Sequence, residues 1–96
     1  MSRKIRWLHL ALADIDELMA YIANDNPKAA NKVAMKIWET TQMLSDHPAM
    51  GRVGRVPGTR EMVVSGTPYI VPYRVVADEI HIIRVLHAAR KWPEKL

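Results

Sequence analysis

From about residue 11 the hydrophobic period of this chain is that of helices, and near residue 60 it becomes that of strands; this change constrains the fold more than any other feature. Before it, apolar residues recur at spacings of three and four, as they do on one face of a helix. After it, apolar and polar residues alternate in short runs that are typical of strands. The chain is therefore expected to form helices first and a sheet afterwards, as in an α+β domain.

Two helices are expected in the first part. The first spans about residues 11–24, with an apolar stripe of Leu12, Ile15, Leu18, Met19 and Ile22. The second begins at Pro27, which fits the first position of a helix, with Asn26 as its cap. Its stripe consists of Ala30, Val33, Ala34, Ile37, Trp38, Thr41 and Leu44. Because the connection is so short, the two helices should form an antiparallel hairpin.

Four strands are expected around this hairpin. Residues 5–7 alternate before it, and residues 60–64, 69–76 and 80–87 alternate after it, while the glycine-rich residues 50–59 form a loop. The last three strands should make an antiparallel meander that the first strand joins. The expected order is β-α-α-β-β-β, with the helical hairpin on one face of an antiparallel sheet and the other face free. One helical turn is expected in residues 88–92.

Length and composition limit the classes of protein. Residues 1–96 fit one domain with one core. The absence of cysteine excludes disulfides, thiolate metal sites and a cysteine nucleophile. No metal-ligand spacing or cofactor fingerprint is found, so we expect neither a metal nor a cofactor. No secretion signal or apolar span of about 20 residues is found either, which makes a cytoplasmic location without membrane contact the default expectation.

The positive charge lies in the second half of the chain. Residues 1–49 hold six basic and six acidic side chains, whereas residues 50–96 hold eight basic and four acidic ones, which accounts for the net charge of +4. Six of these eight are arginines, whose planar guanidinium suits phosphates and carboxylates. An anionic partner is indicated, against the alternative that the charge only keeps the protein soluble.

Two arginines are expected on neighbouring strands among apolar residues, where each needs a partner or a wet groove. They are Arg74 and Arg84. A two-residue loop at Ala77 would place Tyr73 opposite Arg84, and a three-residue loop would reverse the faces. A structural salt bridge from one arginine to Glu61 is the alternative to a functional role.

His87 ends the last expected strand near several cations. Its neighbours Arg84, Arg90 and Lys91 make a setting that suits a base or a hydrogen-bond donor. The alternative is an exposed histidine without a role. His9, His47 and His81 are interpreted as structural or surface residues.

Three runs of the second half carry a family resemblance. They are residues 51–61 (GRVGRVPGTRE), 67–75 (TPYIVPYRV) and 80–93 (IHIIRVLHAARKWP). With the element order, they resemble toxins of the RelE/ParE superfamily, in particular plasmid-stabilisation proteins of the ParE branch. The resemblance implies a toxin that arrests growth and is neutralised, in a hetero-oligomer, by an antitoxin that wraps it by helix packing and strand addition. An acidic antitoxin segment would suit the basic half.

The resemblance also implies two alternative targets. ParE-type members poison DNA gyrase without a clear nuclease site, whereas RelE-type members cut messenger RNA on the ribosome. Ribonuclease members often have a basic residue where this chain has Ile70, and few residues follow Trp92 here. Both features favour gyrase inhibition by binding rather than by catalysis.

Each target implies its own candidate residues. Contact with gyrase would use Arg60, Arg84, His87, Arg90, Lys91 and Trp92. A ribosome-dependent messenger RNA endonuclease would use Arg74 and Arg84 to stabilise the phosphate, and His87 or Tyr73 to transfer protons. A nontoxic remnant and a DNA-binding module are further alternatives, although no recognition-helix pattern supports the latter.

Overall fold

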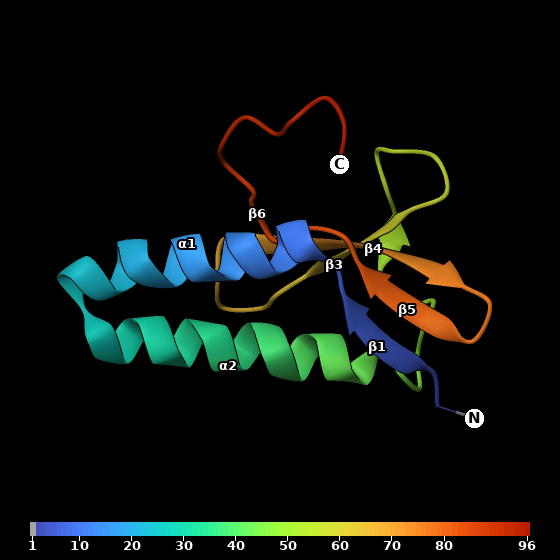
Figure 1. The fold of residues 1–96 in the computed structure, drawn as a ribbon, viewed down its shortest axis with the longest axis horizontal. Helices are drawn as coiled ribbons and strands as arrows, with labels where there is room; N and C mark the ends of the chain where they lie inside the picture. Colours follow the sequence, from blue (N-terminus) through green and yellow to red (C-terminus); the bar gives the residue numbers. More distant parts are fainter. Residues whose placement is uncertain (1) are drawn as a thin grey trace.

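The computed structural model describes residues 2–96 and confirms the α+β prediction (Figure 1). The elements are β1 (Lys4–Trp7), α1 (His9–Asp25), α2 (Pro27–Met43), β2 (Arg52–Val53), β3 (Arg60–Val63), β4 (Tyr69–Val76), β5 (Glu79–Ile82) and β6 (Leu86–His87). Two short strands are additions to the expected order. β2 lies inside the expected loop, and β6 is the detached end of the last expected strand.

The sheet has the order β1-β5-β4-β3-β2, and β6 also pairs with β4. The expected meander of β3, β4 and β5 is antiparallel, and the expected first strand joins the sheet. β1 lies at the edge and runs parallel to β5, so the sheet is mixed rather than antiparallel throughout. The helices cover one face of this sheet (Figure 1).

A single residue, Asn26, separates the two helices. Its backbone amide donates to the carbonyl of Ile22 (2.8 Å), and its side-chain oxygen accepts from the amide of Ala29 (3.2 Å). Asn26 therefore closes α1 and caps α2 at once, as its position before Pro27 predicted. The tight link holds the helices antiparallel, as expected.

The core lies between the hairpin and the inner face of the sheet. Leu18, Ile37 and Leu44 come from the helical half, and Val71, Tyr73, Ile80 and Ile82 from the strands. Ile37, Leu44, Val71 and Tyr73 are completely buried. These residues alternate on β4 and β5, which explains why the period of two predicted both strands.

A bulge interrupts the last expected strand. Tyr73 lies opposite Ile82 and Ile70 opposite Leu86, so residues 83–85 face only two residues of β4. The extra residue bends the strand. The expected pairing of Tyr73 with Arg84 is therefore wrong: the β4–β5 turn leaves Tyr73 opposite Ile82, and Arg84 leaves the ladder.

The C-terminal segment does not form the expected helical turn. The amide of Arg90 and the indole nitrogen of Trp92 both donate to the carbonyl of His87, at 3.2 and 3.1 Å, which closes a turn instead of starting a helix. The segment then curls over the side of the sheet away from α2 (Figure 1). The outer face, expected to be free, is thus partly covered. No helix within residues 2–96 is long and apolar enough to cross a membrane.

Candidate functional site

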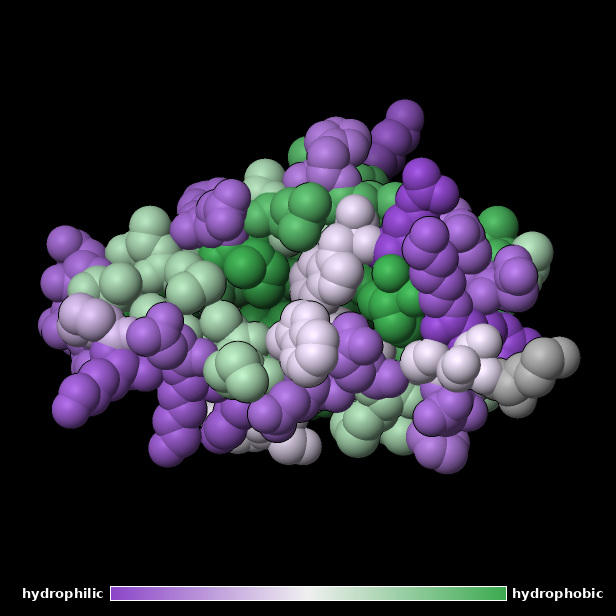
Figure 2. Space-filling view, turned by 60° about the horizontal axis from the view of Figure 1, so that its bottom comes forward, coloured by the Kyte–Doolittle hydropathy of each residue, from purple (hydrophilic) through white to green (hydrophobic). Residues whose placement is uncertain are grey.

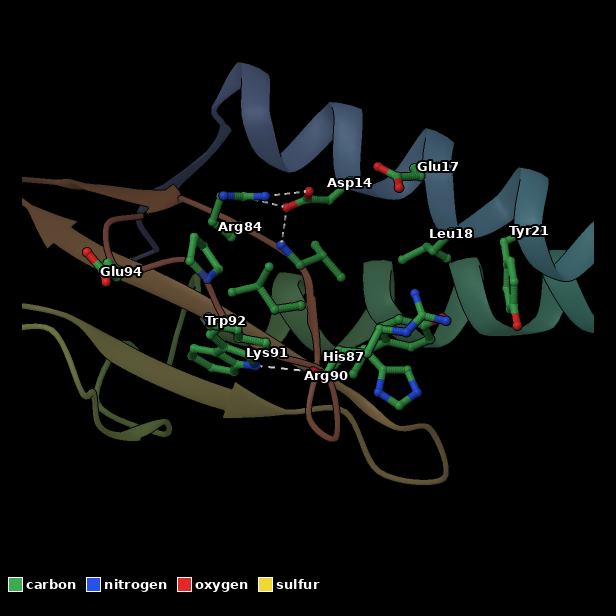
Figure 3. Close-up of a pocket in the computed structure, with 14 residues that line it drawn as sticks. Asp14, Glu17, Leu18, Tyr21, Arg84, His87, Arg90, Lys91, Trp92 and Glu94 are labelled. Carbon is green, nitrogen blue, oxygen red and sulfur yellow. Dashed lines mark hydrogen bonds and ion pairs between the residues drawn. The ribbon is translucent and has the colours of Figure 1, made fainter.

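Arg84 is fixed to α1 by a bidentate ion pair (Figure 3). Its Nε and Nη2 donate to the carboxylate of Asp14 at 2.7 and 2.9 Å, and the amide of Val85 donates to the same carboxylate at 2.9 Å. The hydrogen bonds to Asp14 raise the pKa of Arg84, so its charge is permanent. Asp14 thereby satisfies an arginine and an amide that the bulge turns out of the sheet.

Glu61 is buried, with 3% of its side chain exposed, and its partners come from the preceding loop. Arg52, opposite it on β2, donates at 3.2 Å, and the backbone amide of Arg55 donates at 2.8 Å. The expected salt bridge from Glu61 to Arg74 or Arg84 is therefore wrong. Arg74 is exposed on β4, and Arg84 pairs with Asp14.

The loop is also joined to the C-terminal segment. The guanidinium of Arg55 stacks on the ring of Trp92, 3.6 Å from its centre. The Nε atom of Arg55 also lies 3.5 Å from the carboxylate of Glu61. A cation over an indole is favourable because the ring face is negative. Arg55 was not among the predicted site residues, and no spacing in the sequence indicates its contact with Trp92.

Tyr73 and Arg60 hold the start of this loop. The hydroxyl of Tyr73 donates to the carbonyl of Pro48 (2.7 Å) and accepts from the amide of Gly51 (2.9 Å), and burial raises its pKa. Arg60 donates to the carbonyl of Gly51 (2.8 Å). Gly51 is required because a Cβ there would lie 2.6 Å from the Tyr73 ring. Tyr73 is completely buried, so its hydroxyl is not placed for proton transfer to a ligand.

A polar groove of about 580 Å³ lies between α1 and the C-terminal segment (Figure 3). It brings together five of the predicted contact residues, Arg84, His87, Arg90, Lys91 and Trp92. The opposite wall carries Asp14, Glu17, Leu18 and Tyr21. Arg60 and Arg74 do not line this groove, so the structure separates them from the other candidates.

The side chains of His87 and Arg90, which line this groove, are each oriented by contacts with neighbouring residues. His87 accepts a hydrogen bond from the amide of Ala89 (3.1 Å) and contacts the ring of Tyr69 edge-on at 5.5 Å. Burial raises the pKa of Tyr69, and the charge of Arg90 partly opposes that shift. The guanidinium of Arg90 lies 5.1 Å from the centre of the Tyr21 ring. Both side chains are thus oriented without an ion pair to Asp14 or Glu17.

A second, apolar groove of about 400 Å³ lies along the two helices. It is lined by Trp7, Leu12, Ile15, Ala34, Met35 and Trp38. Figure 2 shows hydrophobic surface between hydrophilic margins on this side of the molecule. Leu12 and Trp38 belong to the stripes that the helical period placed in the core, yet half of each is exposed, at 51% and 53%.

β1 borders this groove with an open edge. The amides of Lys4 and Leu8 donate to the carbonyls of Asp78 and Ile82, at 3.2 and 3.0 Å. Since successive backbone groups of a strand alternate in direction, those of Ile5 and Trp7 point away from the sheet. The groove and an unpaired strand edge therefore lie side by side.

Residues 5–92 match the sequence profile of the family described as the ParE toxin of the type II toxin–antitoxin system parDE. Y4kP, a candidate toxin of Sinorhizobium fredii, is 46% identical, with both chains covered completely. Toxin RelE2 of Caulobacter vibrioides is 34% identical over 91% of this chain and 97% of its own.

Two solved structures share the fold. A chain of the chromosomal ParDE system from P. aeruginosa matches with a TM-score of 0.80 and 29% identity, covering 90% of this chain and 96% of its own. A chain of the RelBE2 complex from Mycobacterium tuberculosis matches with a TM-score of 0.68 and 23% identity, covering 94% and 95%. The similarity extends over nearly the whole chain in each case.

Proposed function

Because the chain belongs to the ParE toxin family of type II toxin–antitoxin systems, we propose that it is held inactive by a cognate antitoxin and acts in the cytoplasm by inhibiting DNA gyrase. The observation that carries the choice of mechanism is the dispersal of the residues a nuclease would need. Arg84 is bound to Asp14, Arg74 is exposed elsewhere, and Tyr73 is buried. A protein that inhibits by binding does not need these groups to converge.

The antitoxin is proposed to bind the apolar groove with an amphipathic helix. Trp7, Met35 and Trp38 would receive the apolar side of that helix, as in other helix-in-groove complexes. The open edge of β1 beside the groove can receive an extended segment of the same chain through backbone hydrogen bonds. The two solved relatives come from systems described as ParDE and RelBE2 toxin–antitoxin pairs, which supports an antitoxin partner.

The antitoxin proposal is tested by placing a charge in the groove. Met35→Asp should weaken the complex with the antitoxin by at least tenfold, because the carboxylate would be buried without a partner. Lys32→Asp is the matched control, since Lys32 is exposed on the same helix outside the groove. Equal affinities of the two variants, measured by isothermal titration calorimetry, would contradict this binding site.

The polar groove is proposed to contact gyrase. His87, Arg90 and Lys91 project from the C-terminal segment, which Arg55 and Trp92 attach to the sheet. Such a segment offers charged groups on a fixed frame, which lowers the ordering cost of binding. Ile70 supports the choice against a nuclease, because it is buried opposite Leu86 where ribonuclease members often have a basic residue.

The target is tested with pure toxin, gyrase and closed circular DNA. We expect loss of supercoiling activity or trapped cleavage complexes, reduced at least tenfold by Arg90→Glu combined with Lys91→Glu. Lys28→Glu combined with Lys32→Glu makes the same charge change on α2 and should leave inhibition intact. Normal supercoiling at saturating wild-type toxin would overturn the gyrase proposal.

An RNA endonuclease that acts on translating ribosomes is the second candidate. The similarity to RelE2 favours it, as does the clustering of His87 with three cations around one groove. It predicts cleavage of messages within minutes of toxin induction, mapped by primer extension, with gyrase unaffected. Intact messages would exclude it and leave the gyrase proposal standing.

A further inference from the structure

Three basic side chains form a straight row on the outer face of the sheet. Arg6 on β1 lies opposite His81 on β5, and His81 lies opposite Arg74 on β4. Side chains that are directly opposite point to the same face, and this face is the outer one because the alternate residues Ile5, Ile80 and Tyr73 pack into the core. The register thus gathers residues that are distant in the sequence.

One carboxylate, that of Glu79, opposes the positive charge of the row. Glu79 lies beside the row, 3.6 Å from Arg6 and 2.9 Å from His81. On the same face of the sheet, Lys4 lies directly opposite Glu79. Among residues 2–96, Arg74 makes no side-chain hydrogen bond or ion pair, and it is exposed. Arg6 is 61% exposed. Arg6 and His81 both contact Glu79, so Arg74 is the member of the row whose charge the described residues leave unopposed.

The row lies at the end of the outer face that the C-terminal segment does not cover. At the other end, Arg52 and Arg55 are engaged with Glu61, and Arg55 also with Trp92. Arg6 shares the carboxylate of Glu79 with His81, and Arg74 has no side-chain partner among residues 2–96. The guanidinium of Arg74, and that of Arg6 with 61% of its side chain exposed, are therefore accessible to a ligand.

We infer that the row of Arg6, His81 and Arg74 is a binding surface for the phosphodiester backbone of a nucleic acid, independent of base sequence. Three neighbouring strands spaced about 4.8 Å apart give a row about 10 Å long. This length is about three times the ~3.4 Å axial rise per phosphate on one strand of duplex DNA. Guanidinium groups bind phosphates in a bidentate manner.

The composition of the row favours a nucleic acid over an acidic protein segment. The buried core of a protein interface is usually more apolar than the surface around it, and no member of the row is apolar, whereas the exposed apolar groove lies on the helical side of the molecule. Phosphate contacts need only cations and donors, and they position a protein on its nucleic acid. The inference goes beyond the proposed function, because direct contact with nucleic acid could serve a toxin of either target.

Binding is measured with the full-length toxin, freed from antitoxin, by fluorescence anisotropy. The probes are a labelled duplex DNA of about 20 base pairs and a single-stranded RNA of equal length, titrated at roughly 50 to 200 mM salt. Arg6→Ala combined with Arg74→Ala should lower the affinity at least tenfold. The slope of log K against log salt should fall by about 0.9 per lost contact on DNA and about 0.7 on RNA. Tighter binding of one probe identifies the preferred nucleic acid.

Lys28→Ala combined with Lys32→Ala removes two exposed cations from α2 and should change neither affinity nor slope. An unchanged slope in the Arg6 and Arg74 variant would overturn the inference. If that variant weakened only the antitoxin complex, the row would be a site for an acidic segment instead. If the Arg6 and Arg74 variant kept both gyrase inhibition and nucleic-acid binding, the row would not be a nucleic-acid site, and the proposed function would stand. Circular dichroism checks that both variants are folded.

Discussion

Asp14 and Arg84, 70 residues apart in the sequence, join the middle of α1 to the bulge between β5 and β6 through hydrogen bonds of 2.7 and 2.9 Å. Only 17% of the Arg84 side chain and 12% of the Asp14 side chain are exposed. The carboxylate also accepts from the amide of Val85. The pair therefore fixes Arg84 and Val85 at one wall of the polar groove.

The first prediction concerns this pair. Asp14→Ala should lower the free energy of unfolding by about 2 to 3 kcal/mol, somewhat less than for a fully buried pair, because it leaves a cation and an amide without partners. Asp14→Asn, which can still accept from the Val85 amide, should cost less. Urea denaturation followed by circular dichroism measures both. A loss below about 0.5 kcal/mol for Asp14→Ala would show that the pair is not structural.

The second prediction concerns the stacking of Arg55 on Trp92. Arg55→Ala should free the C-terminal segment and speed tryptic cleavage after Arg90 and Lys91 severalfold, while the free energy of unfolding changes by only about 1 kcal/mol. Arg52→Ala is the control, since Arg52 shares the partner Glu61 but not the contact with Trp92. Equal cleavage rates in the two variants would mean that the stacking does not hold the segment.

The third prediction concerns Tyr73 and alkaline pH. Because the pKa of Tyr73 is raised in the folded protein, its contribution to stability is complete below the ordinary tyrosine pKa of about 10 and is lost as pH rises through the higher folded value. Tyr73→Phe should cost about 1 to 3 kcal/mol at neutral pH and make stability fall less steeply above pH 10. Tyr69, whose pKa is also raised, keeps part of the slope.

The check on Tyr73 is a series of urea denaturation curves at rising pH. Parallel stability profiles of the wild type and Tyr73→Phe would be incompatible with the buried hydroxyl described above.

The fourth prediction concerns the turn between β4 and β5. Ala77 has a φ of 53°, in the left-handed region that strains a residue with a Cβ. Ala77→Gly should raise the free energy of unfolding by about 0.5 kcal/mol, since relief of strain exceeds the added entropy of the unfolded chain. Ala77→Val should lower it by about 1 kcal/mol or more. Thermal melts of both variants test the sign.

The period of the sequence predicted the helices, their link and the meander, because these depend on local spacing and on Pro27 and Asn26. It could not predict the bulge, which depends on Asp14 reaching Arg84 across the fold. It also missed the partners of Glu61, because β2 has only two residues and no period of its own. The two failures have different causes, because Asp14 and Arg84 are 70 residues apart in the sequence, whereas Glu61 is only nine and six residues from Arg52 and Arg55, in a segment without a period.

The candidate site was predictable in part. Arg84, His87, Arg90, Lys91 and Trp92 line one groove, as their shared position near the end of the sequence favours. Arg60 and Arg74 are elsewhere. The apolar groove was missed, because the spacing that places Ile37 in the core also includes Trp38, and a helical period does not distinguish a core face from a binding face.

The single-residue link at Asn26 has a consequence for the kinetics of neutralisation. Its two hydrogen bonds join the helices at one end, and the buried Leu18 and Ile37 hold them in the core farther along, so the apolar groove is formed before any partner arrives. An antitoxin segment that folds into this groove must then bear the whole entropy of ordering itself. The speed of neutralisation would be governed by how often the antitoxin is already helical, and not by opening of the toxin.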